Sequence, residues 1–227
     1  MSSSTIAQQA SQLAEQMASR SQSDVLSVFA TEQAELEAKG APDGVIAVGA
    51  NLSDTELLDP YGQAVTLYGA LAAQRAVIVF YRGIWCPYCN IALRTYQSEL
   101  LPELDRRGVA LLAVSPQKPD GTLSMQEKHD LSYTVLSDPG NVLARTVGIV
   151  TAPSAEVREA QRQLGLDLTV GNADGTTAIP IATTLIVDGD HVVQWVDVHP
   201  NYATRSEPAA ILAALDATVV EPAEQSA

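Results

Sequence analysis

The chain has 227 residues, of which 46% are hydrophobic, so it can bury a core and is not an intrinsically disordered protein. Its 13 basic and 27 acidic residues give a formal net charge of −14, and such a surface repels nucleic-acid phosphates and anionic lipids. Length and charge therefore favour one globular domain, with or without an appendage, and exclude nucleic acid and membrane as default partners.

The first forty residues are polar, and their apolar residues recur at roughly helical spacing. We predict an N-terminal helical extension over residues 1–40, made of two amphipathic helices with a break near Ser21 to Asp24. It either pads the main domain or a second copy of the chain, or serves as a partner-binding arm. The segment lacks a signal peptide's basic start and apolar run, and no stretch is long enough to span a membrane, so we expect a cytoplasmic protein.

A larger domain is predicted over residues 44–218. It opens with a hairpin of residues 55–58 and 64–67, because Pro and Gly between these apolar pieces favour a turn. The runs 76–81 and 109–114 are continuously apolar, which is typical of parallel strands covered on both faces. Between them lies a helical apolar stripe, so this segment is a predicted β-α-β crossover whose helix kinks at Pro102.

The next elements predicted from the apolar pattern are short: a helix over 122–129, a strand over 133–136, and helices over 141–147 and 156–164. Residues 165–181 show no clear period. This alternation of strands and helices indicates an α/β fold with a mixed sheet flanked by helices.

The strongest hairpin pattern joins residues 183–187 to 191–196, because the Asp-Gly pair between them suits the positive φ angles of a tight turn. A helix over 208–218 closes the domain. Residues 219–227 are expected to be a frayed tail.

Two cysteines stand three residues apart in Cys86-Pro87-Tyr88-Cys89, shortly after the strand over 76–81. Pro87 suits the first position of a helix, which puts Cys86 at the N-cap, where free N–H groups and the helix dipole favour a thiolate. Arg82 adds a nearby positive charge, and cysteines in such settings have pKa values below the free value of about 8.5. We predict Cys86 as the nucleophile and Cys89 as the more buried, less ionised thiol, close enough to form a disulfide.

Two other interpretations of the cysteine pair are weaker. Zinc prefers four ligands, and His129, His191 and His199 lie far from the cysteines without metal-ligand spacing, so no metal site is predicted. Inert core cysteines remain an alternative, because free cysteine is commonly buried. The favoured interpretation is a redox dithiol, and no cofactor is expected.

The segment FYRGIWCPYCN at residues 80–90 resembles the signature of the peroxiredoxin-like branch of the alkyl hydroperoxide reductase/thiol-specific antioxidant superfamily, which has a thioredoxin fold. The resemblance extends over about residues 44–218, including the turn at 58–62 and the motif at 201–208 before the last helix. It implies a thioredoxin-like, peroxiredoxin-type sheet. It also implies that Cys86 is the peroxidatic cysteine and Cys89 a candidate resolving cysteine.

The chain departs from this family's pattern at the site. Peroxiredoxins proper carry a threonine or serine three residues before the reactive cysteine and a proline seven before it, whereas the positions counted from Cys86 hold Gly83 and Val79. Ala182 occupies the place expected for a cis-proline or an arginine before the strand that faces the dithiol.

Arg82 is then the best local cation for a developing peroxide anion. Gly83 and Trp85, which lie between it and Cys86, are predicted with it as substrate-binding residues. A surface salt bridge near the helix start is the alternative role for Arg82.

These observations predict a thiol-dependent peroxidase that reduces hydrogen peroxide or organic hydroperoxides through Cys86 and a disulfide with Cys89. The implied partners are the peroxide and an external thiol reductant of the thioredoxin, glutaredoxin or glutathione type, and a homodimer is left open. Two alternatives remain, a thiol–disulfide oxidoreductase and a redox-sensing module without turnover, because a Cys-X-X-Cys dithiol serves either.

Overall fold

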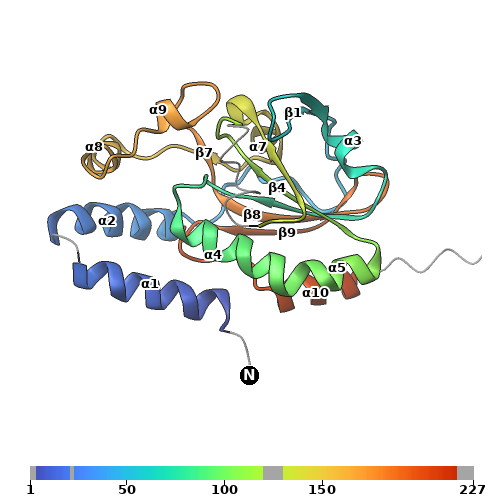
Figure 1. Ribbon diagram of the computed structural model, residues 1–227, viewed down its shortest axis with the longest axis horizontal. Coiled ribbons are helices and arrows are strands. Elements are labelled where there is room, and N and C mark those ends of the chain that lie inside the picture. The colour runs from blue at the N-terminus through green and yellow to red at the C-terminus, as the bar shows by residue number, and fades with distance from the viewer. Residues whose placement is uncertain (1–3, 21–22, 120–129, 219–227) are drawn as a thin grey trace, which may run out of the picture.

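The computed structural model describes residues 4–20, 23–119 and 130–218 (Figure 1). The predicted helix over 122–129 and the predicted tail over 219–227 lie outside these residues. Within the described ranges, every helix is too short or too polar to cross a lipid bilayer.

A seven-stranded mixed sheet forms the centre of the molecule, in the order β2-β1-β5-β4-β3-β8-β9. Its strands are β1 (Glu56–Leu58), β2 (Ala64–Thr66), β3 (Ala76–Phe80), β4 (Ala110–Ser115), β5 (Thr134–Ser137), β8 (Ala182–Val187) and β9 (Val193–His199). The strands β3, β4 and β5 are parallel, whereas β8 runs antiparallel beside β3 and β9 runs antiparallel beside β8. Every residue of β3 is buried, as the unbroken apolar run predicted.

Helices cover both faces of this sheet. One face packs against α4 (Pro87–Thr95), α5 (Leu101–Arg107) and α10 (Pro208–Ala217), and the other against α3 (Leu67–Leu71) and α7 (Val142–Val147). The alternating side chains of β3 divide between these two cores: Val77 and Val79 face one, while Ile78 and Phe80 face the other. The predicted fold class is therefore confirmed.

The remaining elements are short and lie at the end of the sheet where the site is found. They are the 3₁₀ turn η2 (Pro139–Asn141), the strands β6 (Val150–Thr151) and β7 (Ile179–Pro180), which pair with each other, and the helices α8 (Ala155–Gln163) and α9 (Leu168–Gly171). Two of them, α9 and β7, lie within the stretch 165–181, which showed no period in the sequence.

The crossover helix is interrupted by a π-helical turn, η1 (Tyr96–Leu100), which joins α4 to α5. Pro102 at the start of α5 has no N–H to donate to the preceding turn, and the wider π turn accommodates the lost hydrogen bond. The predicted irregularity at Pro102 is thus present, and Gly108, with a φ of 64°, ends α5 in the left-handed conformation.

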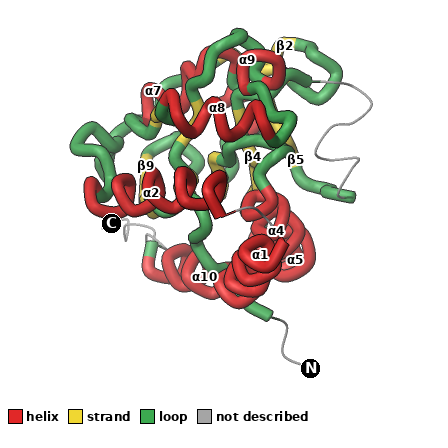
Figure 2. The backbone as a smooth tube through the Cα atoms, turned by 90° about the vertical axis from the view of Figure 1, so that its left-hand side faces the viewer, coloured by secondary structure: helices red, strands yellow, loops and turns green. Residues whose placement is uncertain are grey.

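Two N-terminal helices, α1 (Ile6–Arg20) and α2 (Ser23–Lys39), lie beside the sheet domain (Figure 1). Helix α1 packs along α4, and α2 packs against α8 (Figure 2). The backbone N–H groups of Ile6 and Ala7 donate to the carboxylate of Glu207 at 3.0 and 2.8 Å, which satisfies the otherwise unpaired start of α1. The extension therefore pads the main domain along its length.

Candidate active site

The dithiol lies where the chain leaves β3 and enters α4. Cys86 is the N-cap residue of α4, with extended backbone angles, and Pro87 follows at the first helical position, as predicted. Both cysteines are free, and their side chains are 1% and 0% exposed. The pair is therefore reduced and almost completely covered.

The turn before Cys86 depends on glycine. Gly83 has a φ of 142°, and a Cβ atom built on it would lie 2.5 Å from Nε1 of Trp85. The Gly83 carbonyl accepts a hydrogen bond of 3.1 Å from the Cys86 N–H, which closes the turn. Any larger residue at 83 would displace the indole of Trp85 and strain the backbone.

A second arginine, Arg205, contacts the dithiol from the loop between β9 and α10. Its Nη2 lies 2.8 Å from the sulfur of Cys89, and its side chain is only 7% exposed. The Arg205 Nη1 donates to the carbonyls of Tyr202 and Thr204, at 2.8 and 2.5 Å, so the guanidinium is held against the sulfur. A buried guanidinium without counter-charge is costly, and here a thiolate can supply that charge.

The contacts of the two cysteines favour the opposite order of ionisation from the one predicted. Burial raises the pKa of Cys86 well above its usual range, and the interaction with Cys89 raises it further. Burial also opposes ionisation of Cys89, but the hydrogen bond from the Cys86 thiol and the charges of Arg205 and Arg82 outweigh it and hold the Cys89 pKa well below its usual range. Together with the Arg205 contact, these directions favour a thiolate on Cys89 over one on Cys86.

The reason for this reversal is local geometry. Among the described residues, the Cys86 sulfur accepts no hydrogen bond from the backbone of the first helical turn, so the expected benefit of the N-cap position is not realised. Cys89 instead receives three donors: the Cys86 thiol, the Arg205 guanidinium and the backbone N–H of Arg82. Hydrogen bonds to the charged form favour ionisation even in a buried site.

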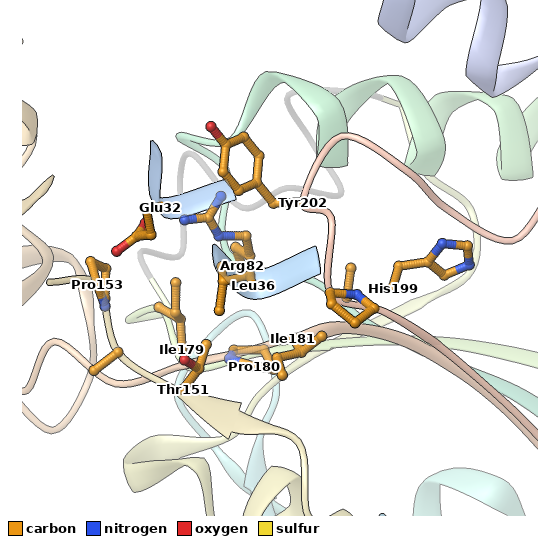
Figure 3. A pocket seen from close by; sticks show the side chains of 13 residues that line it. Glu32, Leu36, Arg82, Thr151, Pro153, Ile179, Pro180, Ile181, His199 and Tyr202 are labelled. Atoms are coloured by element: carbon orange, nitrogen blue, oxygen red, sulfur yellow. The ribbon is translucent and has the colours of Figure 1, made fainter. Parts of the chain in front are cut away.

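Arg82 lies beside the dithiol between two aromatic rings. Its guanidinium carbon is 4.9 Å from the ring centre of Trp85 and 4.8 Å from that of Tyr202, and the side chain is 9% exposed. Figure 3 shows Arg82 beside Tyr202. None of the ion pairs between described residues includes Arg82, so the salt-bridge alternative does not apply. Cation–π contacts hold the charge near the sulfurs without neutralising it.

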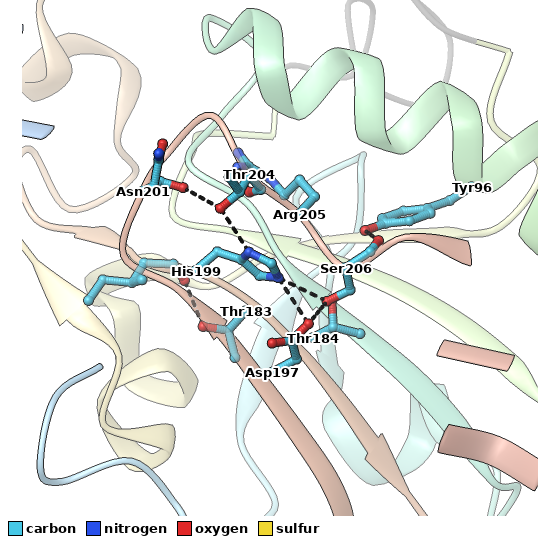
Figure 4. A network of polar contacts seen from close by, with 10 residues as sticks. Tyr96, Thr183, Thr184, Asp197, His199, Asn201, Thr204, Arg205 and Ser206 are labelled. Atoms are coloured by element: carbon cyan, nitrogen blue, oxygen red, sulfur yellow. Dashed lines mark hydrogen bonds and ion pairs between the residues drawn. The ribbon is translucent and has the colours of Figure 1, made fainter. Parts of the chain in front are cut away.

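A polar network fixes the loop that carries Arg205 (Figure 4). His199 at the end of β9 contacts Thr204 Oγ1 through Nδ1 at 2.8 Å and Asp197 Oδ2 through Nε2 at 2.9 Å. Ser206 donates to the same Asp197 oxygen at 2.7 Å, and its carbonyl accepts from Tyr96 at 2.7 Å. The residues on both sides of Arg205 are therefore anchored.

The structure brings most of the predicted site residues together. Arg82, Trp85 and Cys86 line one cavity, and Gly83 shapes the turn between them. Ala182 is the buried first residue of β8 and, with Arg82, lines a small separate cavity of about 20 Å³. Arg205 was not predicted, although it lies in the motif at 201–208 that carried part of the family resemblance.

In the described residues, no group of His, Cys, Asp or Glu side chains could hold a metal ion. A reduced Cys-X-X-Cys pair at the start of the first crossover helix of a mixed sheet defines a dithiol protein of the thioredoxin fold. The AhpC/TSA family matches residues 48–196, about two thirds of the chain, and the protein belongs to that family. This membership confirms the predicted family and supports the predicted thiol-dependent peroxidase activity.

Individual relatives agree with this assignment. The chain is 30% identical over 107 residues to a putative peroxiredoxin bcp of Haemophilus influenzae, a match that covers 46% of this chain and 66% of that protein.

Among solved structures, peroxidoxin BcpB of Mycobacterium tuberculosis has a TM-score of 0.57 at 20% identity and covers 78% of this chain and 99% of its own. Reduced Prx3 of Vibrio vulnificus in complex with H₂O₂ has a TM-score of 0.60 at 19% identity, with coverage of 75% and 99%.

The matched residues 48–196 include β1 to most of β9 and the dithiol. They leave out both N-terminal helices and the loop that carries Arg205. Two components of the site therefore come from outside the matched region: the Arg205 guanidinium that contacts Cys89, and part of the cavity wall.

Proposed function

We propose that the protein reduces peroxides with the Cys86–Cys89 pair and that Cys89 is the sulfur that attacks. The observation that carries this proposal is the buried Arg205 guanidinium, 2.8 Å from the Cys89 sulfur. It stabilises a thiolate there, and a thiolate is the nucleophile that peroxide oxidation requires.

The spacing of the family motif supports the same choice. Counted from Cys89, the position three residues before is Cys86 and the position seven before is Arg82. Cys86 donates a hydrogen bond to Cys89, so its thiol takes the place of the threonine or serine hydroxyl of peroxiredoxins proper. The hydroxyl that appeared to be missing is replaced by a thiol.

The reaction then proceeds in two balanced steps. The Cys89 thiolate attacks one peroxide oxygen, the O–O bond breaks, and the departing RO⁻ takes the Cys86 proton, which leaves a Cys89 sulfenic acid, ROH and a Cys86 thiolate. That thiolate attacks the sulfenic sulfur, forms the Cys86–Cys89 disulfide and releases hydroxide, which combines with the proton that Cys89 gave to the solvent on ionising and forms water. Arg82 and Arg205 stabilise the negative oxygen as the O–O bond breaks.

An external thiol reductant must restore the pair by thiol–disulfide exchange, which returns the two electrons that the peroxide removed. We infer a thiol reductant of the thioredoxin, glutaredoxin or glutathione class and a cytoplasmic setting, since two cysteines three residues apart in so long a chain fit redox chemistry in a reducing compartment better than a structural disulfide. A homodimer stays a prediction.

Trapping the sulfenic acid tests the assignment of the attacking sulfur. After one equivalent of peroxide, a cyclic 1,3-diketone should label Cys89 in the Cys86→Ser protein, and the Cys89→Ser protein should remain unlabelled in mass spectra. If instead the Cys89→Ser protein were labelled at Cys86 and the Cys86→Ser protein stayed unlabelled, Cys86 would be the attacking sulfur, as predicted from the sequence. Wild-type protein that reacts faster with a small disulfide than with any peroxide would favour the oxidoreductase alternative.

A further inference from the structure

A cavity of about 610 Å³ opens directly on Cys86 and Arg82. Hydrogen peroxide occupies about as much space as two water molecules, roughly 60 Å³. The cavity is therefore about ten times larger than that substrate requires, and it falls within the usual range of sites for small organic molecules, about 300–1,000 Å³.

The walls of this cavity are mainly apolar and come from five parts of the chain, the fifth being Tyr202 in the loop before α10. Met17 of α1 and Phe29 of α2 form one side, and Leu164 and Leu166 after α8 form another. Trp85 and Tyr88 flank the dithiol. Among the described lining residues, Gln33, Gln161 and the hydroxyl groups of Tyr88 and Tyr202 are polar, and Arg82 alone carries a full charge.

The N-terminal helices are held in this position by contacts to the loop that carries Arg205. Gln33 of α2 donates to Asn201 at 2.7 Å, and Tyr202 donates to the Phe29 carbonyl at 3.3 Å. The start of α1 is bound by Glu207. The cavity wall and the loop of Arg205 are thus one connected structure, and the cavity is not an incidental gap beneath a loose arm.

We propose that α1 and α2 form a specificity pocket, and that it binds the organic group of a bulky, apolar hydroperoxide. The proposal rests on the proposed peroxidase activity and states which class of peroxide the site selects. The organic group packs between Met17, Phe29 and Leu164, while the O–O group lies against Cys86 and Arg82. The Cys89 sulfur is directly behind, in hydrogen-bond contact with Cys86. Removing the organic group from water favours binding by roughly fourfold for each buried methylene.

A neutral hydroperoxide fits the distribution of charged side chains around the cavity. The only full charge among the described lining residues lies at the dithiol, where the peroxide oxygen becomes negative. The rest of the pocket offers no cation to a carboxylate or phosphate on the substrate. A neutral substrate with an alkyl or aryl group, such as cumene hydroperoxide, therefore fits better than an anionic one.

Relative rates with two peroxides test the pocket. We expect the wild-type kcat/KM for cumene hydroperoxide to exceed that for hydrogen peroxide at least tenfold. Met17→Glu and Leu164→Glu each place a charge on the apolar wall at a side chain that is 36% or 63% exposed, so the fold should tolerate them. Both should lower this ratio at least tenfold. Val170→Glu is the matched control, because Val170 is 66% exposed and lies outside the lining residues, and its ratio should not change.

Binding without turnover gives a second readout. The alcohol 2-phenyl-2-propanol, the product of cumene hydroperoxide reduction, should saturably change the fluorescence of Trp85 in a Trp195→Phe background, where Trp85 is the remaining indole. The Leu164→Glu change should weaken that binding at least fivefold.

Failure of the proposed pocket and failure of the proposed peroxidase activity give different results in these experiments. Rapid reduction of both peroxides with equal kcat/KM, and no binding of the alcohol, would overturn the pocket and leave the peroxidase standing. Saturable binding of the alcohol by a protein that consumes no peroxide would overturn the peroxidase, and with it the assignment of a hydroperoxide as the ligand.

Discussion

Arg205 and Cys89 are separated by 116 residues in sequence, yet their side chains are in contact. The sequence allowed Cys86, Pro87 and Arg82 to be placed correctly, because their relation is local and follows from helix-capping rules. The sequence could not show that the Arg205 guanidinium contacts the sulfur of Cys89. The electrostatics of a buried pair depend on what the tertiary fold brings to it, which a local motif does not record.

Replacing Arg205 should raise the pKa of Cys89, because the variant removes the positive charge closest to its sulfur. We expect Arg205→Met to shift the thiolate titration upward by about 1–3 pH units, followed by absorbance at 240 nm. The peroxide rate at pH 7 should fall and partly recover as the pH rises. Arg145→Met, on the distant helix α7, is the control. An unchanged titration in Arg205→Met would mean that Arg205 does not set the charge of the pair.

Arg82 differs from Arg205 because it lies against aromatic rings and lines the cavity. Arg82→Ala should slow the reaction with peroxide more than the reaction with a small disulfide, even at a pH where Cys89 is fully ionised, because only peroxide develops charge on oxygen. The measurement is the second-order rate of each oxidant with wild type and variant. Equal losses with both oxidants would reduce Arg82 to a residue that only sets the thiolate charge.

Gly83 connects backbone conformation to the position of Trp85. Gly83→Ala should cost about 1–3 kcal/mol of unfolding free energy, because alanine is strained at a φ of 142° and its Cβ meets the indole. Urea denaturation gives this value, and Trp85 fluorescence should change in the folded protein. Gly44→Ala, where a Cβ meets open space, should stay within about 0.5 kcal/mol of wild type.

At the scale of elements, the strands and long helices were predictable, since the buried run of β3 and the crossover stripe are continuous patterns. The predicted hairpins and the closing helix are present with small shifts of their ends. Residues 165–181 could not be assigned, because α9 and β7 are too short to show a period. Loop 201–207 was recognised as a motif, but its anchoring to β9 depends on contacts across the fold.

Asp197 at the end of β9 anchors this loop, and its hydrogen bond with His199 lowers its pKa. A lowered carboxyl pKa stabilises the folded state above the unfolded value of about 3.9, and this contribution is lost as the pH falls through the folded value. Asp197→Asn should therefore lower the urea midpoint at pH 6, and the difference from wild type should shrink below about pH 4.

The same variant should also raise the Cys89 pKa, because Arg205 lies in the loop that Asp197 holds through Ser206. Asp43→Asn, at an exposed position, should change neither property. A Cys89 titration identical to wild type in Asp197→Asn would show that the loop keeps Arg205 in place without this network.

At the scale of the whole molecule, the net charge of −14 and the N-terminal helices distinguish the chain. The charge should leave the rate with a neutral hydroperoxide unchanged between low and high salt. A hydroperoxide that carries a carboxylate should react faster as salt screens the repulsion. Stopped-flow rates at 20 and 500 mM salt test this, and a neutral substrate with a strong salt dependence would contradict it.

The docking of the N-terminal helices could not be derived from their sequence, because an amphipathic face shows that a helix packs but not against what. Here the packing places helices from residues 6–39 against α4, α8 and the loop before α10. Only the folded chain shows that these helices contribute to the wall of a cavity at the dithiol.

The nearly complete cover over the two sulfurs, 1% and 0% exposed, has a kinetic consequence for regeneration. A small peroxide can enter the cavity that Cys86 lines, but the thiol of a protein reductant is too bulky to follow it to a side chain that is only 1% exposed. Regeneration by a protein reductant must therefore wait for a local opening, and its rate should level off at the opening rate however much reductant is added. Dithiothreitol, which is small enough to enter, should keep a linear dependence over the same range. The rate of oxidation would thus be set by the reaction with peroxide, and the rate of reduction by a protein partner would be set by local opening of the fold.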